Sequence, residues 1–376
     1  MKTHICLVSE QAAANLLPAL DWQMKPDEVI LVVSPKMMAR ASFLEPVLKE
    51  NGIRVERLDL KNEHDYGETE RQLLELAAGL DGRQVSLNLT GGTKLMSVAA
   101  QSVAQASDWR MFYVDADTDQ VTWLGRDRSP PHKIEERLRL RHYLGSYGYR
   151  IEQEAPHPAH GWPRQALIET LVGQIGSLER PLAQLNWLAQ QAEDAGRLSV
   201  AMSEEQRDSR ALEALLRHFS EAGLLSVEQA MIRFPDRASL SFVKGGWLEL
   251  HVFKGVKALT GETGIRDKAL NLQVFGPSGE KAEFDVAFMA RNRLFVVECK
   301  TARMDRPEAP KANDALFKLA ENCRRVGGLA TRGMLASYRP LREAERKLAE
   351  ALRIELVCGA ELARMRERLK AWIERR

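Results

Sequence analysis

Two acidic residues and a lysine within residues 283–300 have the types and spacing of a phosphodiester-cleaving site. The segment EFDVAFMARNRLFVVECK is predicted to form a hairpin, with Asp285 on the first strand and Glu298 and Lys300 on the second. Because Glu298 and Lys300 are two residues apart, their side chains point to the same face of the strand. Two carboxylates beside a lysine can hold a divalent cation and stabilise charge on a phosphodiester.

Each residue type has a chemical role in such a site. Mg²⁺ and Mn²⁺ prefer oxygen ligands, which the carboxylates of Asp285 and Glu298 and the backbone carbonyl of Cys299 would supply. Lys300 would hold the attacking water or the charge that develops on the phosphate. Glu-x-Lys is a common tripeptide, so the alternative is an ordinary hairpin with a surface glutamate and lysine.

A helix before the hairpin adds a third carboxylate. Apolar residues at helical spacing follow Gly245 and Gly246, which predicts a helix that carries Glu249. Glu249 is therefore a further catalytic candidate, and Glu283 lies on the same strand face as Asp285. For Glu283, an exposed strand residue is the alternative. The order of helix glutamate, strand aspartate and strand Glu-x-Lys is that of the PD-(D/E)xK nuclease core.

A second motif, at residues 83–105, has the properties of an anion site. The predicted strand VSLNL ends at Thr90-Gly91-Gly92-Thr93-Lys94, and an amphipathic helix follows. Glycines allow close approach of a ligand to the backbone, and a helix N-terminus offers free N–H groups. The loop lacks the GxxxxGK[ST] pattern of a Walker A motif. A tight strand-to-helix turn without a ligand is the alternative.

The first 125 residues alternate between predicted strands and helices, which indicates a mostly parallel, doubly wound α/β sheet. Ligands of such sheets bind beyond the carboxyl ends of the strands. Ser9, Gln11 and Ser34 follow predicted strands, as the TGGTK loop does. No G-x-G-x-x-G follows the first strand, so a dinucleotide cofactor is not expected.

LNLTGGTK in an N-terminal Rossmann-like domain, followed by GGWLE, EFDV and ECK, resembles the CRISPR-associated CARF-domain nucleases of type III systems. The resemblance implies a CARF sensor domain at 1–132 and a restriction-endonuclease-like PD-(D/E)xK domain at 244–376. It also implies a cyclic oligoadenylate activator, usually cyclic tetra-adenylate, bound across a homodimer. Thr90 to Lys94 match the ligand loop of the family, and Asp285, Glu298 and Lys300 match its catalytic set. Ser9, Gln11 and Ser34 match by position only.

The middle of the chain is expected to connect these two domains. Residues 133–163 are predicted to be a linker helix and loop. Residues 164–243 are predicted to be helical, with breaks near Pro181 and Gly196, and to end in a winged-helix-like arrangement that could enter a nucleic-acid groove. A structural spacer is the alternative for this segment.

Composition indicates an intracellular enzyme of two or three domains. The chain has 376 residues, and its four cysteines show neither CxxC nor metal-ligand spacing. Without a signal peptide or an apolar run of membrane-spanning length, we expect a cytoplasmic protein that does not interact with membranes. Residues 291–376 contain 21 Lys and Arg against 12 Asp and Glu, an excess that would attract a nucleic-acid backbone.

Three other functions are compatible with parts of the pattern. A CARF-type transcription regulator would bind DNA through residues 164–243, and a constitutive nuclease would need no ligand. Arg137-x4-His142 fits the loose R-x4–6-H spacing of HEPN ribonucleases, but such pairs arise by chance in arginine-rich helices. A metal-dependent, ligand-activated nuclease accounts for both motifs. The motifs leave open whether DNA or RNA is cut.

Overall fold

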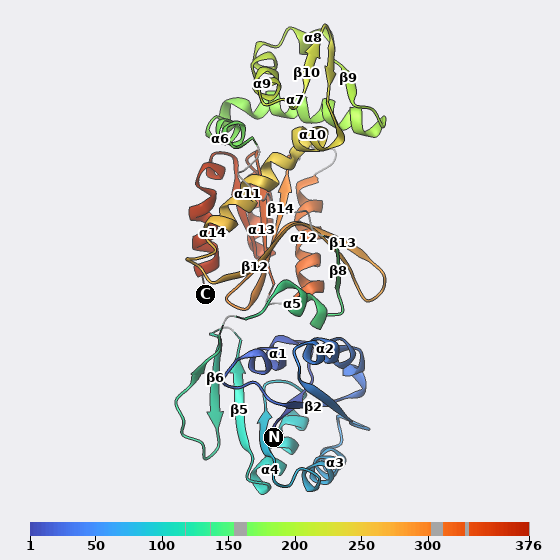
Figure 1. Cartoon of the computed structure of the whole chain (residues 1–376), viewed down its shortest axis with the longest axis vertical. Helices are drawn as coiled ribbons and strands as arrows, with labels where there is room; N and C mark the ends of the chain where they lie inside the picture. Colours follow the sequence, from blue (N-terminus) through green and yellow to red (C-terminus); the bar gives the residue numbers. More distant parts are fainter. Residues whose placement is uncertain (117, 136, 154–163, 302–310, 328–330, 376) are drawn as a thin grey trace.

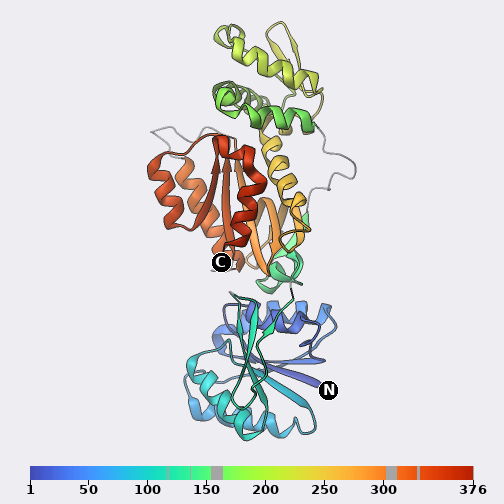
Figure 2. The ribbon, with the colours of Figure 1, turned by 90° about the vertical axis from the view of Figure 1, so that its left-hand side faces the viewer.

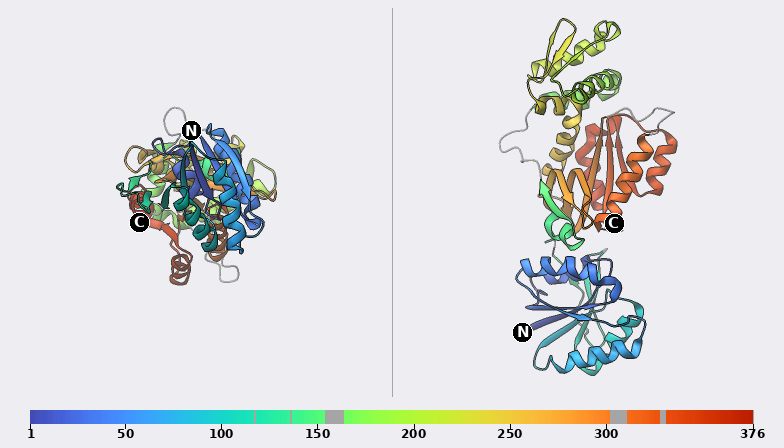
Figure 3. Two further views of the ribbon diagram at one scale, coloured as in Figure 1. Left: turned by 90° about the horizontal axis from the view of Figure 1, so that it is seen from below. Right: turned by 90° about the vertical axis from the view of Figure 1, so that its right-hand side faces the viewer.

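The chain is folded into three domains that follow one another along its long axis (Figure 1). The computed structural model describes residues 1–116, 118–135, 137–153, 164–301, 311–327 and 331–375. The N-terminal domain lies at one end, a domain built on a second sheet lies in the middle, and a helical domain, defined here as residues 164–241, lies at the other end. Two further directions of view show the same order (Figures 2 and 3).

The N-terminal domain is a seven-stranded sheet in the order β3-β2-β1-β4-β5-β6-β7, covered by helices on both faces. Its first five strands in this order are parallel, and β6 and β7 are antiparallel additions. Its strands are β1 (Lys2–Leu7), β2 (Glu28–Val33), β3 (Arg54–Asp59), β4 (Gln84–Asn88), β5 (Arg110–Asp115), β6 (Gln120–Leu124) and β7 (His132–Lys133). Its helices are α1 (Ala13–Leu20), α2 (Met38–Glu50), α3 (Tyr66–Ala78) and α4 (Lys94–Ala106). The predicted α/β class is confirmed.

The continuous apolar run of β2 explains its central position. All six of its residues are buried, as expected for a parallel strand covered on both faces. Val29 and Leu31 pack with α1 and α2, whereas Ile30 and Val32 pack with α3 and α4. The α1–α2 layer lies between the N-terminal sheet and the central domain (Figure 1).

The central domain is a six-stranded mixed sheet in the order β16-β15-β14-β13-β12-β8. β14, β15 and β16 are parallel, and the other neighbours are antiparallel. Its strands are β8 (Arg150–Gln153), β12 (Ile265–Phe275), β13 (Lys281–Ala290), β14 (Arg293–Lys300), β15 (Arg332–Ser337) and β16 (Ile354–Cys358). Its helices are α5 (Leu140–Ser146), α11 (Trp247–Ala258), α12 (Lys311–Gly327), α13 (Glu343–Ala351) and α14 (Met365–Glu374).

The β13–β14 hairpin joins the central domain to the N-terminal domain. Its two-residue turn, Arg291-Asn292, has φ of 48° and 53°, which suits the twist of a tight hairpin. Asn292 is buried, and its Oδ1 accepts hydrogen bonds from the backbone N–H groups of Arg137 (3.2 Å) and Leu138 (3.4 Å). Its Nδ2 donates to Asp119 Oδ1 and to the Glu135 carbonyl, both at 3.2 Å. The tip of the hairpin is therefore bound into the N-terminal domain.

The helical domain has the element order of a winged helix. Its helices are α6 (Gln165–Gly173), α7 (Ile175–Asp194), α8 (Glu204–Arg207), α9 (Arg210–Glu221) and α10 (Arg237–Ser241). A small sheet in the order β10-β11-β9 is formed by β9 (Ser199–Ala201), β10 (Ser226–Glu228) and β11 (Met231–Arg233). α7 continues through Pro181, so the break predicted there is wrong, whereas α7 does end next to Gly196.

The expected connecting segments differ from the structure in two respects. Within the predicted 133–163 linker, Lys133 belongs to the N-terminal sheet and Arg150–Gln153 is β8, the edge strand that pairs with β12. The helix of the linker is short, at Leu140–Ser146, and residues 154–163 lie outside the described residues. Residues 164–243 do not lie between the two sheet domains, because the helical domain is beyond the central one (Figure 1). The two sheet domains contact each other directly.

Across the described part of the chain, no helix combines the length and apolar character needed to span a membrane. Cys6, Cys299, Cys323 and Cys358 are buried free thiols.

Candidate functional site

The β13–β14 ladder opens where the three predicted catalytic residues lie. The last backbone pair is Val286 with Val297, and Asp285 and Glu298 are the next position on each strand. Instead of continuing the ladder, Asp285 Oδ2 accepts a hydrogen bond of 2.6 Å from the backbone N–H of Cys299. The hairpin thus brings both carboxylates to one place.

Burial and like charge perturb the Asp285 carboxyl. Loss of water around this half-buried group, together with the negative charges of Glu298 and Glu249, raises the pKa of Asp285 to about 8. The Cys299 N–H and the Lys300 charge act in the opposite direction but are weaker. An acidic cluster in which one member resists ionisation is typical of a functional site.

Glu249 and Lys300 complete this cluster. Burial raises the pKa of Glu249, an effect that a hydrogen bond from Asn271 opposes and the charge of Glu283 reinforces. Burial lowers the pKa of Lys300, but the charges of Glu298 and Asp285 outweigh it, so that the net shift is upward. The Lys300 Nζ forms an ion pair with Glu298 Oε1, as expected for side chains on one face of β14.

Asp285, Glu249 and Lys300 line a cleft of about 1180 Å³ between the central and helical domains, and Glu298 adjoins it through its ion pair with Lys300. From the central domain, the cleft is lined by Glu249, Asn271, Glu283, Asp285 and Lys300, among others. From the helical domain, α7 supplies Arg180, Gln184, Asn186, Trp187 and Gln190. The helical domain therefore forms a wall of the cleft that contains the predicted catalytic residues.

The acidic cluster has the donor atoms that a hard divalent cation needs. Carboxylate oxygens of Asp285, Glu298 and Glu249 repel one another, and a cation among them would relieve this repulsion. Within the described residues, no three His, Cys, Asp or Glu side chains already stand in metal-binding geometry. Release of Glu298 from Lys300 would free one carboxylate oxygen. The cluster fits a divalent cation through its donor set.

The TGGTK loop connects β4 to α4, as predicted. The Thr93 side chain caps α4 by accepting a hydrogen bond of 3.2 Å from the N–H of Met96, which leaves the first N–H groups of the helix open to a ligand. A Cβ at Gly91 would lie 2.2 Å from the Leu7 carbonyl oxygen, so only glycine allows this approach to β1. Gly92 has a φ of 77°.

Hydrogen bonds from neighbouring strands hold the start of this loop. Thr90 Oγ1 donates to Asn88 Oδ1 at 2.6 Å and accepts from the N–H of Val114 at 2.7 Å. Asn88 Nδ2 in turn donates to Asn15 Oδ1 at 3.0 Å and to the Ala14 carbonyl at 2.9 Å. Asn88 and Asn15 were not predicted. No sequence pattern distinguishes a buried asparagine that supports a loop from any other polar residue.

The other predicted ligand residues follow strands at the same edge of the sheet. β2, β1 and β4 are parallel neighbours, so Ser34, Ser9 and Thr90 follow their carboxyl ends. The Ser9 Oγ would lie 3.2 Å from a Cβ at Gly91. Ser34 is buried, whereas Gln11 and Lys94 are exposed. A separate groove of about 1030 Å³, lined by Lys2, His4 and Arg110 among others, lies at the opposite, amino edge.

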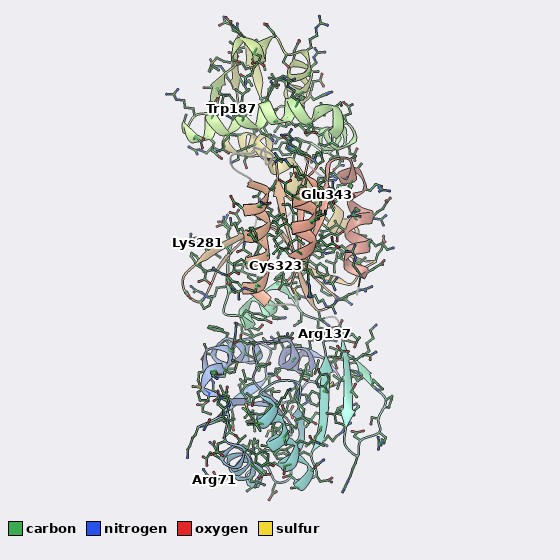
Figure 4. All side chains as sticks on the ribbon, turned by 180° about the vertical axis from the view of Figure 1, so that it is seen from behind. Arg71, Arg137, Trp187, Lys281, Cys323 and Glu343 are labelled. Carbon is green, nitrogen blue, oxygen red and sulfur yellow. The ribbon has the colours of Figure 1, made fainter. Side chains whose placement is uncertain are left out.

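Arg137 and His142 lie at the junction of the N-terminal and central domains. Arg137 forms an ion pair with Glu135 at 2.6 Å, and its position at the junction is labelled in Figure 4. His142 is buried, and the described residues that line the cleft include neither of them. Their spacing does not correspond to a site of its own here.

Two family comparisons cover most of the chain. Residues 3–143 match the family described as the Card1 CARF domain, and residues 236–376 match the family described as the Card1-like endonuclease domain. No curated protein matches the chain significantly. The C-terminal part of the chain is therefore an endonuclease domain, and the resemblance seen in the motifs is confirmed.

Three solved structures share the fold. Protein VC1899 from Vibrio cholerae is 28% identical with a TM-score of 0.90, covering 99% of this chain and 98% of that one. Can2 from Sulfobacillus thermosulfidooxidans in complex with cyclic tetra-adenylate is 23% identical with a TM-score of 0.84, covering 100% of both chains. A type III CRISPR defence DNA nuclease activated by cyclic oligoadenylate is 24% identical with a TM-score of 0.56, covering 90% of this chain and 45% of that chain.

Proposed function

We propose that this chain, which joins a Card1 CARF domain to a Card1-like endonuclease domain and so belongs to the CARF-domain nucleases, is a metal-dependent endonuclease switched on by a cyclic oligoadenylate. The observation that carries the proposal is that Asp285, Lys300 and Glu249 line one cleft, with Glu298 paired to Lys300 beside them. Its role would be antiviral defence in a type III CRISPR system.

The acidic cluster would hold Mg²⁺ or Mn²⁺. Asp285 and Glu298 would supply carboxylate oxygens. The Cys299 carbonyl is a further ligand candidate, because the N–H and C=O of one strand residue point to the same neighbouring strand, and the Cys299 N–H faces Asp285. When bound, the cation would neutralise the non-bridging oxygens of the phosphate and make a bound water more acidic.

Lys300 and Glu249 have complementary roles in this site. Lys300 would donate hydrogen bonds to the attacking water or to the phosphate, once its ion pair with Glu298 is exchanged for substrate. Glu249 lies on α11 and would supply a further carboxylate to the cation. The cluster supports a PD-(D/E)xK mechanism because its members come from one helix and two adjacent strands.

The activator site would be the carboxyl edge of the N-terminal sheet. Phosphates of a cyclic oligoadenylate would bind the open N–H groups at the start of α4 and the Lys94 ammonium, and Ser9, Gln11 and Ser34 would contact the ring from adjacent strands. The Can2 structure contains cyclic tetra-adenylate, which makes this ring the first to test.

The active species would be a homodimer that reads one ring. A two-fold axis can pass through both a dimer and a four-membered ring, so each subunit would bind half of it. Leu95 and Val98 support this arrangement, because both are exposed on α4 directly beside Lys94. They are three residues apart and form an apolar strip that a second copy would cover.

No finding supports the alternative of a ligand-responsive transcription regulator. The substrate would be DNA, single-stranded RNA or both, and cleavage of DNA would be a nick or a complete break. The protein would act in the cytoplasm, where such activators and targets occur.

The test of the nuclease proposal is cleavage by purified variants with activator and Mg²⁺ or Mn²⁺. Asp285→Asn and Glu298→Gln should abolish cutting of plasmid, single-stranded DNA and RNA while ring binding persists. Glu343→Gln is the matched control, since Glu343 is an exposed glutamate of the same domain (Figure 4). Full cleavage by either cleft variant, or by wild type in EDTA, would overturn the proposal.

A further inference from the structure

The helical domain is fastened to the endonuclease domain beside the catalytic lysine. Asn186 on α7 donates a hydrogen bond of 2.6 Å to the carbonyl of Thr301, the residue after Lys300. Glu179 pairs with Arg339 at 2.7 Å, and Glu193 pairs with Lys244. These contacts fix α7 along most of its length against the cleft.

One face of α7 is turned toward the acidic cluster. Arg180, Gln184, Trp187 and Gln190 recur every three or four residues, which is the spacing of one helix face, and all of them line the cleft. Trp187 is 50% exposed although it belongs to the fixed part of the helix. Figure 4 shows its position on α7. A large aromatic side chain on a fixed helix, left uncovered in a cleft, is suited to bind another flat ring.

The polar groups around Trp187 are suited to a nucleotide. Arg180, Lys244 and Arg339 line the same cleft. Lys244 and Arg339 are held in place by Glu193 and Glu179, so Arg180 would be the first of the three to attract the phosphate backbone. An aromatic platform in a cleft that also carries cationic side chains is the general arrangement by which proteins bind unpaired bases.

From this geometry we infer that α7 is part of the substrate site, and that Trp187 stacks on a nucleobase next to the phosphate being cut. This inference rests on the proposed nuclease function and deepens it. Trp187 is then a positioning residue: it places the strand so that the scissile phosphate reaches Lys300 and the acidic cluster. It takes no part in the chemistry itself.

The experiment compares Trp187→Ala and Trp187→Phe with wild type and with Trp22→Ala. Trp22 is a tryptophan of similar exposure, 58%, in the N-terminal domain, which makes it a matched control. With activator and metal, Trp187→Ala should raise KM for a single-stranded oligonucleotide about 5- to 150-fold with kcat unchanged. Trp187→Phe should retain most of the affinity, and Trp22→Ala should behave as wild type.

A second set of substrates separates stacking from a structural role. On an oligonucleotide that lacks the base beside the cleavage position, wild type and Trp187→Ala should have equal KM values. Unchanged KM of Trp187→Ala on the normal substrate, or an equal loss on both substrates, would overturn the inference. Oligonucleotide binding measured by anisotropy in EDTA gives the same comparison without cleavage. Failure of wild type itself to cut would count against the proposed function, not against Trp187.

Discussion

Replacement of Asn292 should uncouple activator binding in the CARF domain from cleavage in the endonuclease domain. Asn292 forms part of the turn of the β13–β14 hairpin, and at the other end of the same two strands lie Asp285 and Glu298. Its amide makes four hydrogen bonds to residues of the 119–138 segment, with lengths of 3.2–3.4 Å. The hairpin therefore connects the CARF domain to the proposed catalytic residues directly, and movement of the CARF domain would be transmitted along it.

The free energy that the Asn292 side chain contributes to the domain junction follows from its four hydrogen bonds. At ~0.5–1.5 kcal/mol for each net hydrogen bond, and with bond lengths at the long end of the range, Asn292→Gly should remove about 2–4 kcal/mol from the junction. Glycine keeps the positive φ without strain, so the loss belongs to the side chain. Allosteric coupling is typically about 1–3 kcal/mol, which is the same size. We expect activator-stimulated cleavage to fall at least about tenfold, equivalent to ~1.4 kcal/mol.

The assay measures cleavage rate with and without cyclic tetra-adenylate, and ring affinity by calorimetry, for both turn variants. Asn292→Gly should bind the ring as wild type does but lose stimulation. Arg291→Gly is the matched control, since Arg291 is the other turn residue, with a φ of 48°, and its side chain makes a contact of 3.5 Å to the Glu374 carbonyl within its own domain. Equal stimulation in Asn292→Gly and wild type would refute transmission through the hairpin.

Three further predictions concern single residues. Lys94→Ala should weaken ring binding by ~1.5–3 kcal/mol because it removes a charge-assisted contact, and calorimetry that finds wild-type affinity would reduce TGGTK to a simple turn. Asp285 keeps its proton up to about pH 8 in the folded protein but loses it near pH 4 when unfolded. The unfolded chain therefore binds fewer protons in this window, and the stability of the metal-free protein should fall as pH rises from 4 to 8. Asp285→Asn should flatten this fall in thermal denaturation in EDTA, with Glu343→Gln as control, and an unchanged slope would contradict it. Gly245→Ala should lower cleavage, because its Cβ would lie 2.4 Å from Thr301 Oγ1 and displace the strand end beside Lys300; wild-type rates in this variant would show that the site tolerates the shift.

Local patterns are sufficient to predict the elements that carry the proposed catalytic residues. Successive side chains of β13 and β14 point alternately to the two buried faces of the sheet. The Arg291-Asn292 turn joins the two strands as a hairpin. The positions of Asp285, Glu298 and Lys300 follow from this register. The strand, glycine turn and helix around TGGTK were predictable for the same reason, since each depends on residues close in sequence.

Contacts between distant segments could not be predicted in this way. β8 is a short strand whose four residues are all exposed, so it shows no apolar alternation, and its place at the sheet edge depends on β12. The role of α7 as a cleft wall depends on Asn186 meeting the Thr301 carbonyl, 115 residues away. Asn292 has the same character, because its partners in the 119–138 segment are more than 150 residues away along the chain. Such residues have ordinary polar identities, and only the fold shows what they connect.

Ring-dependent cleavage is the most direct test of a ligand-activated nuclease. Purified protein is incubated with Mg²⁺ or Mn²⁺, a panel of plasmid, single-stranded DNA and RNA, and cyclic tri-, tetra- or hexa-adenylate, with Glu298→Gln in parallel. We predict that cleavage by wild type requires both cyclic tetra-adenylate and the metal. Glu298→Gln should show no cleavage with any of the rings. If wild type cleaves equally well without a ring and with each of the three rings, activation by a cyclic oligoadenylate is contradicted. The protein would then be a constitutive nuclease.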